Sequence, residues 1–187
     1  MVMERDQALE LLRKHVKNEK MIAHCIASEA VLRDLADRLG EDREKWGLAG
    51  LLHDVDVEVT NADPRTHALE GARILEDMGV DREVVEAIRL HNEEADHAGT
   101  RHKPLHHALA AGETITGLIT ATALVYPDKK VASVKPKSIT KRMKEKAFAA
   151  SVNRDTIREC EHLGLSLQEF AEISLHAMKR VGPEIGL

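Results

Sequence analysis

With 187 residues, the chain is long enough to bury one sizeable core, and we expect a single domain over residues 1–187. Aromatic residues make up only 2% and charged residues 32% of the sequence, which favours amphipathic helices with an aliphatic core over a sheet sandwich. The net charge of −5 argues against general binding to nucleic acid, so no DNA partner is expected.

The sequence carries no sign of a membrane span or of secretion. No apolar run approaches the length that crosses a bilayer, and the first residues, MVMERDQALELL, lack the apolar core of a signal peptide. We therefore expect a cytoplasmic protein with no membrane partner. Cys25 and Cys160 have no paired spacing, which argues against a disulfide scaffold or a cysteine-type zinc site.

The first half of the chain is predicted to form five helices. Apolar residues recur there at helical spacing. The fourth helix is expected to follow Pro64 and to end at Gly79, with His67 and Met78 on one face. The predicted helical segments are 4–17, 18–39, 42–53, 64–79 and 81–91.

The second half begins with a polar, irregular stretch over residues 92–103. Pro104 then opens a long helix to Val125, in which Glu113 is the single charge after Ala108. A loop over 126–138, a basic helix over 140–150 and two closing helices over 153–163 and 166–181 are expected to follow. The prediction is an all-α globule of about eight or nine helices.

Six residues on these elements have side chains that bind divalent metals. Each histidine alone is more simply interpreted as a core residue satisfied by one hydrogen bond. Together, imidazoles and carboxylates on separate helices are how helical bundles build metal sites, and such a mixed set suits Mn, Fe, Co, Ni, Zn or Mg. Six donors are too many for one ion with an open position, but they suffice for two ions. The six are His24, His53, Asp54, His67, His91 and Glu113.

Two members of this set have distinctive settings. His53 and Asp54 follow an apolar run at a predicted helix end, where the backbone can turn both side chains toward one ion, and Asp54 is expected to bridge two ions. Glu113 needs a cation or hydrogen bonds if it is buried, and a metal would supply the cation. The alternative is a buried acid that is protonated or paired with Arg101 or Lys103.

Several motifs carry a resemblance to a known family. They are His24, the sequence GLLHD that ends in His53 and Asp54, the segments HALEGARIL and AIRLHNE, and a later carboxylate. This pattern resembles the HD superfamily of metal-dependent phosphohydrolases, in its HDIG-type, small stand-alone form. The resemblance implies an all-helical fold, metal ligands at the five positions from His24 to His91, and a catalytic role for His53 and Asp54.

This sequence also departs from the family pattern at two places. The signature reads HDVD, with Asp56 where a glycine is expected, and the chain contains no GYP motif, so hydrolysis of cyclic-di-GMP is not supported. The closing aspartate of the family corresponds to Glu113, which keeps an oxygen ligand with one more methylene.

A basic segment runs from Lys129 to Lys146 in a chain that is acidic overall. It is interpreted either as a solvated helix face or as an electropositive rim for a substrate phosphate. The residues predicted to contact substrate are Arg101, Lys137, Lys141, Arg142 and Lys144. Four further histidines, His97, His102, His106 and His107, are expected at the surface or beside the ligands.

We therefore expect a metal-dependent phosphohydrolase that uses one or two divalent ions and metal-activated water on a small phosphoester, with nucleotides among the candidates. The metal-site core spans about residues 18–125, and the basic segment and closing helices span 126–187. Two alternatives are an HD-type di-iron oxygenase and a non-catalytic module that binds a metal or nucleotide. The sequence leaves substrate, native metal, general acid and homo-oligomer formation open.

Overall fold

The computed structural model describes residues 3–96 and 99–187, and within them it is entirely helical. The all-α fold class is therefore confirmed, and the nine α-helices of the described residues agree with the predicted eight or nine. The elements are α1 Arg5–His15, α2 Glu19–Leu39, α3 Arg43–Leu52, α4 Leu69–Asp77, α5 Arg82–His91, α6 Pro104–Leu124, the 3-10 helix η1 Val131–Ser133, α7 Pro136–Arg142, α8 Arg154–Arg158, the 3-10 helix η2 Glu159–Leu163, and α9 Leu167–Val181.

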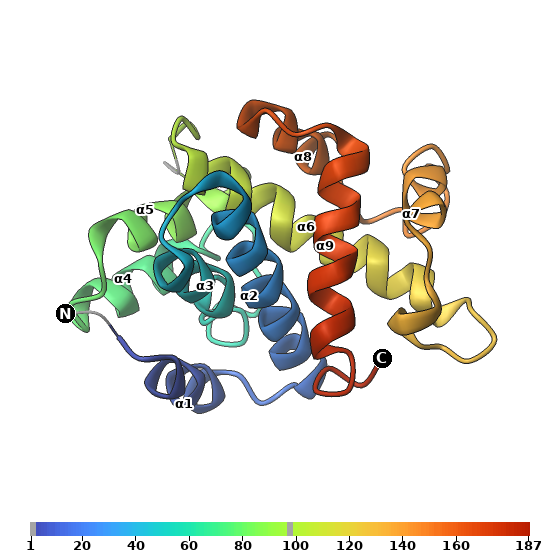
Figure 1. Ribbon diagram of the computed structural model, residues 1–187. Helices are drawn as coiled ribbons and strands as arrows, with labels where there is room; N and C mark the ends of the chain where they lie inside the picture. Colours follow the sequence, from blue (N-terminus) through green and yellow to red (C-terminus); the bar gives the residue numbers. More distant parts are fainter. Residues whose placement is uncertain (1–2, 97–98) are drawn as a thin grey trace.

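Helix α2 lies at the centre of the molecule. It packs against α3, α6 and α9, and Figure 1 shows it between α3 and α9. Asn18 begins the helix by accepting a hydrogen bond from the backbone N–H of Lys20, and Gly40 ends it in the left-handed region, at a φ of 74°. The core around it is aliphatic, as the composition predicts, with Leu32 and Leu35 fully buried.

Helix α3 approaches α2 closely because of a glycine. A Cβ atom added at Gly50 would lie 2.7 Å from the backbone oxygen of Ser28 on α2, so only glycine fits this crossing. The crossing carries the end of α3, where His53 is the C-cap residue, against the middle of α2. The sequence therefore positions His53 beside His24 by backbone contact rather than by a long side chain.

Helix α4 begins later than predicted. It starts at Leu69, and His67 lies in the preceding turn instead of on a helix face. The buried carboxylate of Asp56 explains the difference, because it accepts hydrogen bonds from the backbone N–H groups of Ala68 and Gly71 and so caps the helix from outside. Met78, which is predicted to share a helix face with His67, is the C-cap residue of α4 and is 49% exposed.

The predicted basic helix over 140–150 is likewise wrong. Helix α7 covers Pro136–Arg142, and the chain then forms turns up to residue 152. The guanidinium of Arg154 donates hydrogen bonds to the carbonyl oxygens of Ala149 and Val152, at 2.6 and 2.7 Å. These bonds stabilise a folded-back loop, because they satisfy carbonyl groups that a helix would have bonded internally.

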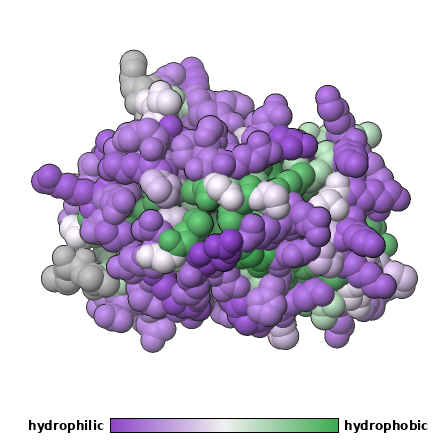
Figure 2. All heavy atoms as spheres, turned by 45° about the horizontal axis from the view of Figure 1, so that its top comes forward, coloured by the Kyte–Doolittle hydropathy of each residue, from purple (hydrophilic) through white to green (hydrophobic). Residues whose placement is uncertain are grey.

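The two closing helices lie close to their predicted bounds. The first is split into α8 and the 3-10 helix η2, and Gly164, with a φ of 74°, separates η2 from α9. Figure 2 shows that the viewed face is mainly hydrophilic, with one band of hydrophobic residues across its middle. Among the described helices, none has both the length and the apolar character needed to cross a membrane.

Candidate metal centre and pocket

The structure brings all six predicted metal ligands together from five parts of the chain. His24 comes from α2, His53 and Asp54 from the end of α3, and His67 from the turn before α4. The last residue of α5, His91, and Glu113 on α6 complete the cluster. His53 is fully buried, and Asp54 and His91 are 7% and 6% exposed, so the cluster is the inner end of a pocket rather than a surface patch.

The Asp54 carboxylate occupies the middle of the cluster. Its Oδ2 lies 3.4 Å from Nε2 of His53 and 3.6 Å from Nε2 of His24. Its Oδ1 lies 3.1 Å from Nε2 of His67 and 3.7 Å from Nε2 of His91. Oε2 of Glu113 lies 3.7 Å from Nε2 of His24. Each oxygen of Asp54 therefore faces its own pair of histidines.

The outer nitrogen of each histidine is held by an acceptor of the protein. Nδ1 of His53 and of His91 lies 2.8 and 2.6 Å from the backbone oxygens of Gly50 and Ile88, which can only accept. Nδ1 of His67 lies 2.7 Å from the carboxylate of Asp56. These three rings therefore carry a proton on Nδ1, and in their neutral form each presents the lone pair of Nε2 to the cluster.

The fourth histidine has the same orientation. The hydroxyl of Thr116 donates to the backbone oxygen of Glu113, so it accepts from Nδ1 of His24 at 2.9 Å. With both Nδ1 atoms protonated, Nε2 of His24 and Nε2 of His53 face each other at 3.1 Å. Two neutral rings would place their lone pairs against each other at this distance, so the arrangement needs a proton or a metal cation between or beside them.

The residues present fit a divalent metal. Atoms bound about 2.0–2.2 Å from one ion lie about 3–3.5 Å from each other, close to the 3.1–3.7 Å separations that the Asp54 and Glu113 oxygens make with the histidines. The described residues contain two overlapping groups whose ligand atoms all lie within 4.8 Å, and they share His53. Histidine nitrogens fixed through their other ring atom are the usual arrangement in metal sites.

The protonation states also suit metal binding. Burial lowers the pKa of His53 to about 3, so this ring is neutral at neutral pH. Burial alone would raise the pKa of Asp54, but the surrounding histidines, His53 foremost, hold it well below its usual value. Burial raises the pKa of Glu113, against the opposing effect of His24. The cluster therefore combines neutral imidazole with an ionised central carboxylate.

His67 is the exception among the four rings. Burial opposes its charged form, but hydrogen bonds to Asp54 and Asp56 outweigh that effect and raise its pKa to about 10. Without a cation in the cluster, this histidine takes up a proton and supplies the positive charge itself. A bound metal would replace that proton, so metal and proton compete at His67.

A pocket of about 400 Å³ opens from the cluster toward solvent. Five residues of the cluster line its inner end, and the C-terminal part of the chain contributes to its outer wall. Within the described part of the chain, no lysine or arginine lines it. The lining residues are His24, Asp54, His67, His91, Asn92, Glu93, Glu94, Glu113, Thr114, Gly117, Ser151, Val152, Asn153 and Thr156.

The comparisons with known proteins agree with this geometry. A family model described as HD domain matches residues 21–124, which is more than half of the chain. The chain belongs to the HD domain family. The match starts just before His24 and ends with α6, so it contains all six clustered residues. The predicted resemblance to the HD superfamily is thereby confirmed.

Curated relatives share part of this HD domain. Ribonuclease Y of Nitratidesulfovibrio vulgaris strain DP4 is 32% identical over 77 residues, which are 41% of this chain and 15% of that protein. Ribonuclease Y of Lawsonia intracellularis is 33% identical over 76 residues, with the same coverage of 41% and 15%. Ribonuclease Y of Cutibacterium acnes is 30% identical over 79 residues, which cover 42% and 15% of the two chains. The chain thus spans about 15% of the length of these relatives.

The residues predicted to contact substrate do not line this pocket. Arg101 is 13% exposed at its side chain and is engaged with Glu159 and Glu93. Arg142 pairs with Glu145 and stacks on the ring of Phe148 at 4.0 Å. The exposed side chain of Lys141 also lies near Glu145, and Lys137 and Lys144 likewise lie outside the lining. The role of these five residues in binding substrate remains a prediction.

Three residues with supporting roles were not recognised as such from the sequence. Asp56 orients His67, and Thr116 orients His24. The side-chain amide of Asn92 donates to the backbone oxygens of Pro64 and His67, at 2.7 and 3.0 Å, and so ties the His67 turn to the end of α5. Asp56 lies two residues after Asp54 and Thr116 three residues after Glu113, but ordinary turns and helices contain the same spacings, so the sequence alone does not single them out.

The other histidines have separate environments. His106 is buried, and its Nε2 lies 3.6 Å from a carboxylate oxygen of Glu86. His107 stacks on His162 and hydrogen-bonds Glu159, 2.8 Å from its Nδ1. His102 contacts the ring of His106 edge-on, whereas His97 lies outside the described residues. None of those described lines the pocket of the HD domain.

Proposed function

We propose that this HD-domain protein is a metal-dependent phosphohydrolase that acts on a small phosphoester, with nucleotides among the candidate substrates. The observation that carries the proposal is the orientation of the four histidines. Each imidazole turns Nε2 toward the Asp54 carboxylate while the opposite ring nitrogen is held by the protein. Such outward anchoring is typical of rings that bind a metal rather than of core histidines.

The proposed site holds one or two divalent ions. Support for two comes from Asp54, because one of its oxygens faces His24 and His53 and the other faces His67 and His91. A carboxylate in that position can bridge two ions, with Glu113 completing the ligand set next to His24. The nitrogen and oxygen donors suit Mn, Fe, Co, Ni, Zn or Mg.

The chemistry follows from the proposed ligands and the pocket. A divalent ion bound there would lower the pKa of a water molecule and neutralise phosphoryl oxygens. Thr116 and Asp56 keep the rings of His24 and His67 in orientation, so that the nitrogen donors need not rearrange when substrate enters. The pocket beyond Asp54 would receive the rest of the phosphoester. His53 is fully buried, so solvent does not reach the cluster on the side away from the pocket.

A substrate panel tests the proposal. Purified protein would be analysed for bound metal and then assayed with phosphomonoesters, phosphodiesters, nucleotides and a short RNA, in wild type and in His53→Ala. We expect metal-dependent release of phosphate or nucleotide in wild type and loss of metal and activity in the variant, with helical circular dichroism largely retained. Wild-type metal content and turnover in His53→Ala would contradict the assignment.

Two other functions use the same donor set. An HD-type di-iron oxygenase would contain iron and consume oxygen when a substrate is added. A non-catalytic module would bind metal or nucleotide tightly without turnover anywhere in the panel. The relatives are named Ribonuclease Y, and this chain spans about 15% of their length. RNA is therefore included as one member of the substrate panel.

A further inference from the structure

The outer wall of the pocket comes from the C-terminal part of the chain. Ser151, Val152, Asn153 and Thr156 line the pocket beside the residues that follow His91. These four residues lie beyond residue 124, where the family match ends. This part of the pocket surface therefore lies outside the segment that the family model matches.

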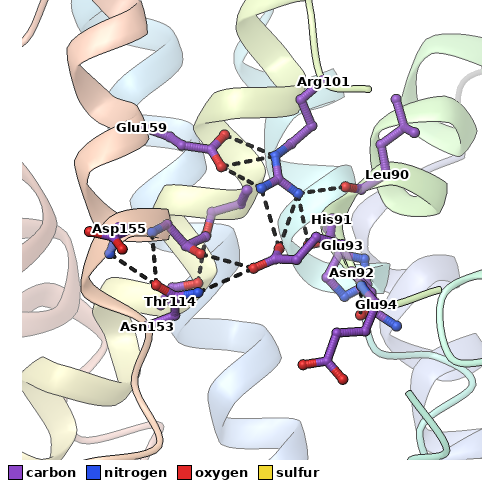
Figure 3. A network of polar contacts seen from close by, with 12 residues as sticks. Leu90, His91, Asn92, Glu93, Glu94, Arg101, Thr114, Asn153, Asp155 and Glu159 are labelled. Atoms are coloured by element: carbon purple, nitrogen blue, oxygen red, sulfur yellow. Dashed lines mark hydrogen bonds and ion pairs between the residues drawn. The ribbon is translucent and has the colours of Figure 1, made fainter. Parts of the chain in front are cut away.

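The wall is attached through Glu93 to the segment that follows helix α5. One oxygen of its carboxylate accepts hydrogen bonds from the side chains of Asn153 and Thr156, at 3.3 and 3.2 Å. The other oxygen accepts from Arg101 at 3.2 Å (Figure 3). Glu93 thus has partners on both oxygens, and its charge is balanced by a guanidinium that lies behind the wall.

The arginines near the wall are turned away from the pocket. Arg101 donates to the carboxylate of Glu159 at 2.9 Å and to the backbone oxygen of Leu90 at 2.9 Å, as Figure 3 shows. Arg154 donates to backbone oxygens of the preceding loop, among them that of Ala149. A guanidinium held by several acceptors is not free to meet a substrate anion.

Glu94 differs from Glu93. Its backbone N–H donates to the side chain of Asn92, but its carboxylate makes no hydrogen bond or ion pair with another described residue, and in Figure 3 it extends apart from the network. Glu94 is exposed and lines the pocket together with Glu93. The part of the pocket beyond the histidine–carboxylate cluster therefore presents hydroxyl, amide and carboxylate groups, and none of the described residues that line it is a lysine or arginine.

We propose that this wall selects phosphomonoesters whose leaving group is neutral or carries an amine, and that Glu94 is a specificity-determining residue which disfavours further anionic groups. The inference rests on the proposed phosphohydrolase activity. The reacting phosphate would be neutralised at the cluster, but a second anion would meet the carboxylate of Glu94, and among the described residues no lysine or arginine lines the pocket to offset it. At about 400 Å³ the pocket lies near the small end of ligand sites, which favours compact esters over nucleoside polyphosphates.

Three substrates of similar size test the charge preference. Phosphoethanolamine, glycerol 3-phosphate and 3-phosphoglycerate are phosphomonoesters whose remote group is positive, neutral and negative. With metal-loaded wild type, kcat/KM should fall in that order, by about 5- to 100-fold between the first and the last, on the scale of one like-charge contact at a partly exposed site. The difference should decrease as salt is added, because the contact is open to solvent.

Variants at position 94 test the residue. Glu94→Gln should reduce the ratio of kcat/KM between the cationic and anionic substrates several-fold, and Glu94→Lys should reverse the preference. Glu172→Gln on α9 removes an exposed carboxylate that does not line the pocket, and it should leave the ratio unchanged. Metal content should be the same in all four proteins, which separates selectivity from loss of the cluster.

Four outcomes would overturn the inference. Equal kcat/KM for the three esters would reject it while leaving the proposed function standing, and so would an unchanged ratio in Glu94→Gln. A preference for 3-phosphoglycerate that is lost in the double variant Lys141→Glu, Lys144→Glu would assign anion recognition to the basic segment. Absence of turnover with every ester of the wider panel would reject the proposed function itself, and the inference with it.

Discussion

At the scale of single residues, the hydrogen bond on the far side of each ring decides what the histidines can do. A core histidine needs one partner and has no reason to turn a bare nitrogen toward another ring. Here the carbonyl of Gly50 fixes His53 and the hydroxyl of Thr116 fixes His24, so that their Nε2 atoms face each other. Glu113 lies beside this pair and is the only carboxylate other than Asp54 within the two groups of clustered donors.

Substitutions at Glu113 test whether this residue is a metal ligand or a buried acid. Glu113→Gln keeps the size of the side chain but removes its charge, so metal affinity should fall about 10- to 100-fold, on the scale of perturbing a metal shell. Glu113→Asp should have a smaller effect, because the oxygen ligand is kept. Metal would be titrated into each metal-free protein while thermal unfolding is followed. Wild-type affinity in the Gln variant would remove Glu113 from the ligand set.

The residues that cluster together could be predicted from the sequence, but the partners that orient them could not. Polar residues on apolar faces, such as His24 and Glu113, are visible in a sequence because they break a pattern. The role of Asp56 is not visible, because a carboxylate two residues after Asp54 is also what an ordinary solvated turn contains. Arg101 was expected near a phosphate for its charge alone, and only the fold reveals the acceptors that surround it.

At the scale of elements, the turn between α3 and α4 links the fold to the site. Helical periodicity predicts most helices near their observed bounds. It does not show where a helix is capped by a side chain that lies well before it in the sequence. The Asp56 carboxylate accepts from the backbone N–H groups of Ala68 and Gly71 and from the ring of His67. One buried side chain therefore starts helix α4 and orients a proposed ligand.

Asp56→Asn should affect stability and metal binding together. The amide keeps the size of the side chain, but it cannot accept all three hydrogen bonds, so the unfolding free energy should fall by about 1–3 kcal/mol, the range for a buried hydrogen bond to a charged group. Metal affinity should fall about 10-fold or more because His67 loses its orientation. Chemical denaturation and metal titration would measure the two effects.

A matched control is Asp77→Asn, which removes an exposed carboxylate paired with Arg73. This variant should change the unfolding free energy by less than about 1 kcal/mol, as is usual for surface ion pairs, and should leave metal binding intact. If Asp56→Asn behaves like the control in both measurements, the proposed link between helix α4 and the cluster is wrong.

At the scale of the whole molecule, the C-terminal helices complete the domain. Helix α6 packs against α8 and η2, and α9 packs against α2, so the predicted parts 18–125 and 126–187 share an interface. The division of the chain into domains remains a prediction, but this packing supports a single unit. Glu159 is a central contact, because it accepts from Arg101 at 2.9 Å and lies 2.8 Å from Nδ1 of His107.

The Glu159 contact should make the free energy of unfolding depend on pH. Burial alone would raise the pKa of Glu159, but hydrogen bonds from Arg101 and His107 outweigh it and lower the pKa below the usual value of 4.5. The carboxylate therefore stabilises the fold fully at pH values above 4.5, and that contribution is lost as pH falls through the lowered pKa. Unfolding free energies of wild type and Glu159→Gln should differ by about 1–3 kcal/mol at neutral pH and converge in acid. A difference that persists unchanged in acid would contradict this account.

The most direct test of the central claim is reconstitution of metal-free protein. The chain would be stripped with a chelator, dialysed, and titrated with single divalent metals while phosphoester hydrolysis and bound metal are measured in wild type and Asp54→Asn. We predict no turnover without metal, recovery that saturates at one or two ions per chain, and neither tight binding nor recovery in the variant. Full hydrolysis by the metal-free protein, or wild-type metal binding and turnover in Asp54→Asn, would contradict the assignment of this cluster as a catalytic metal centre.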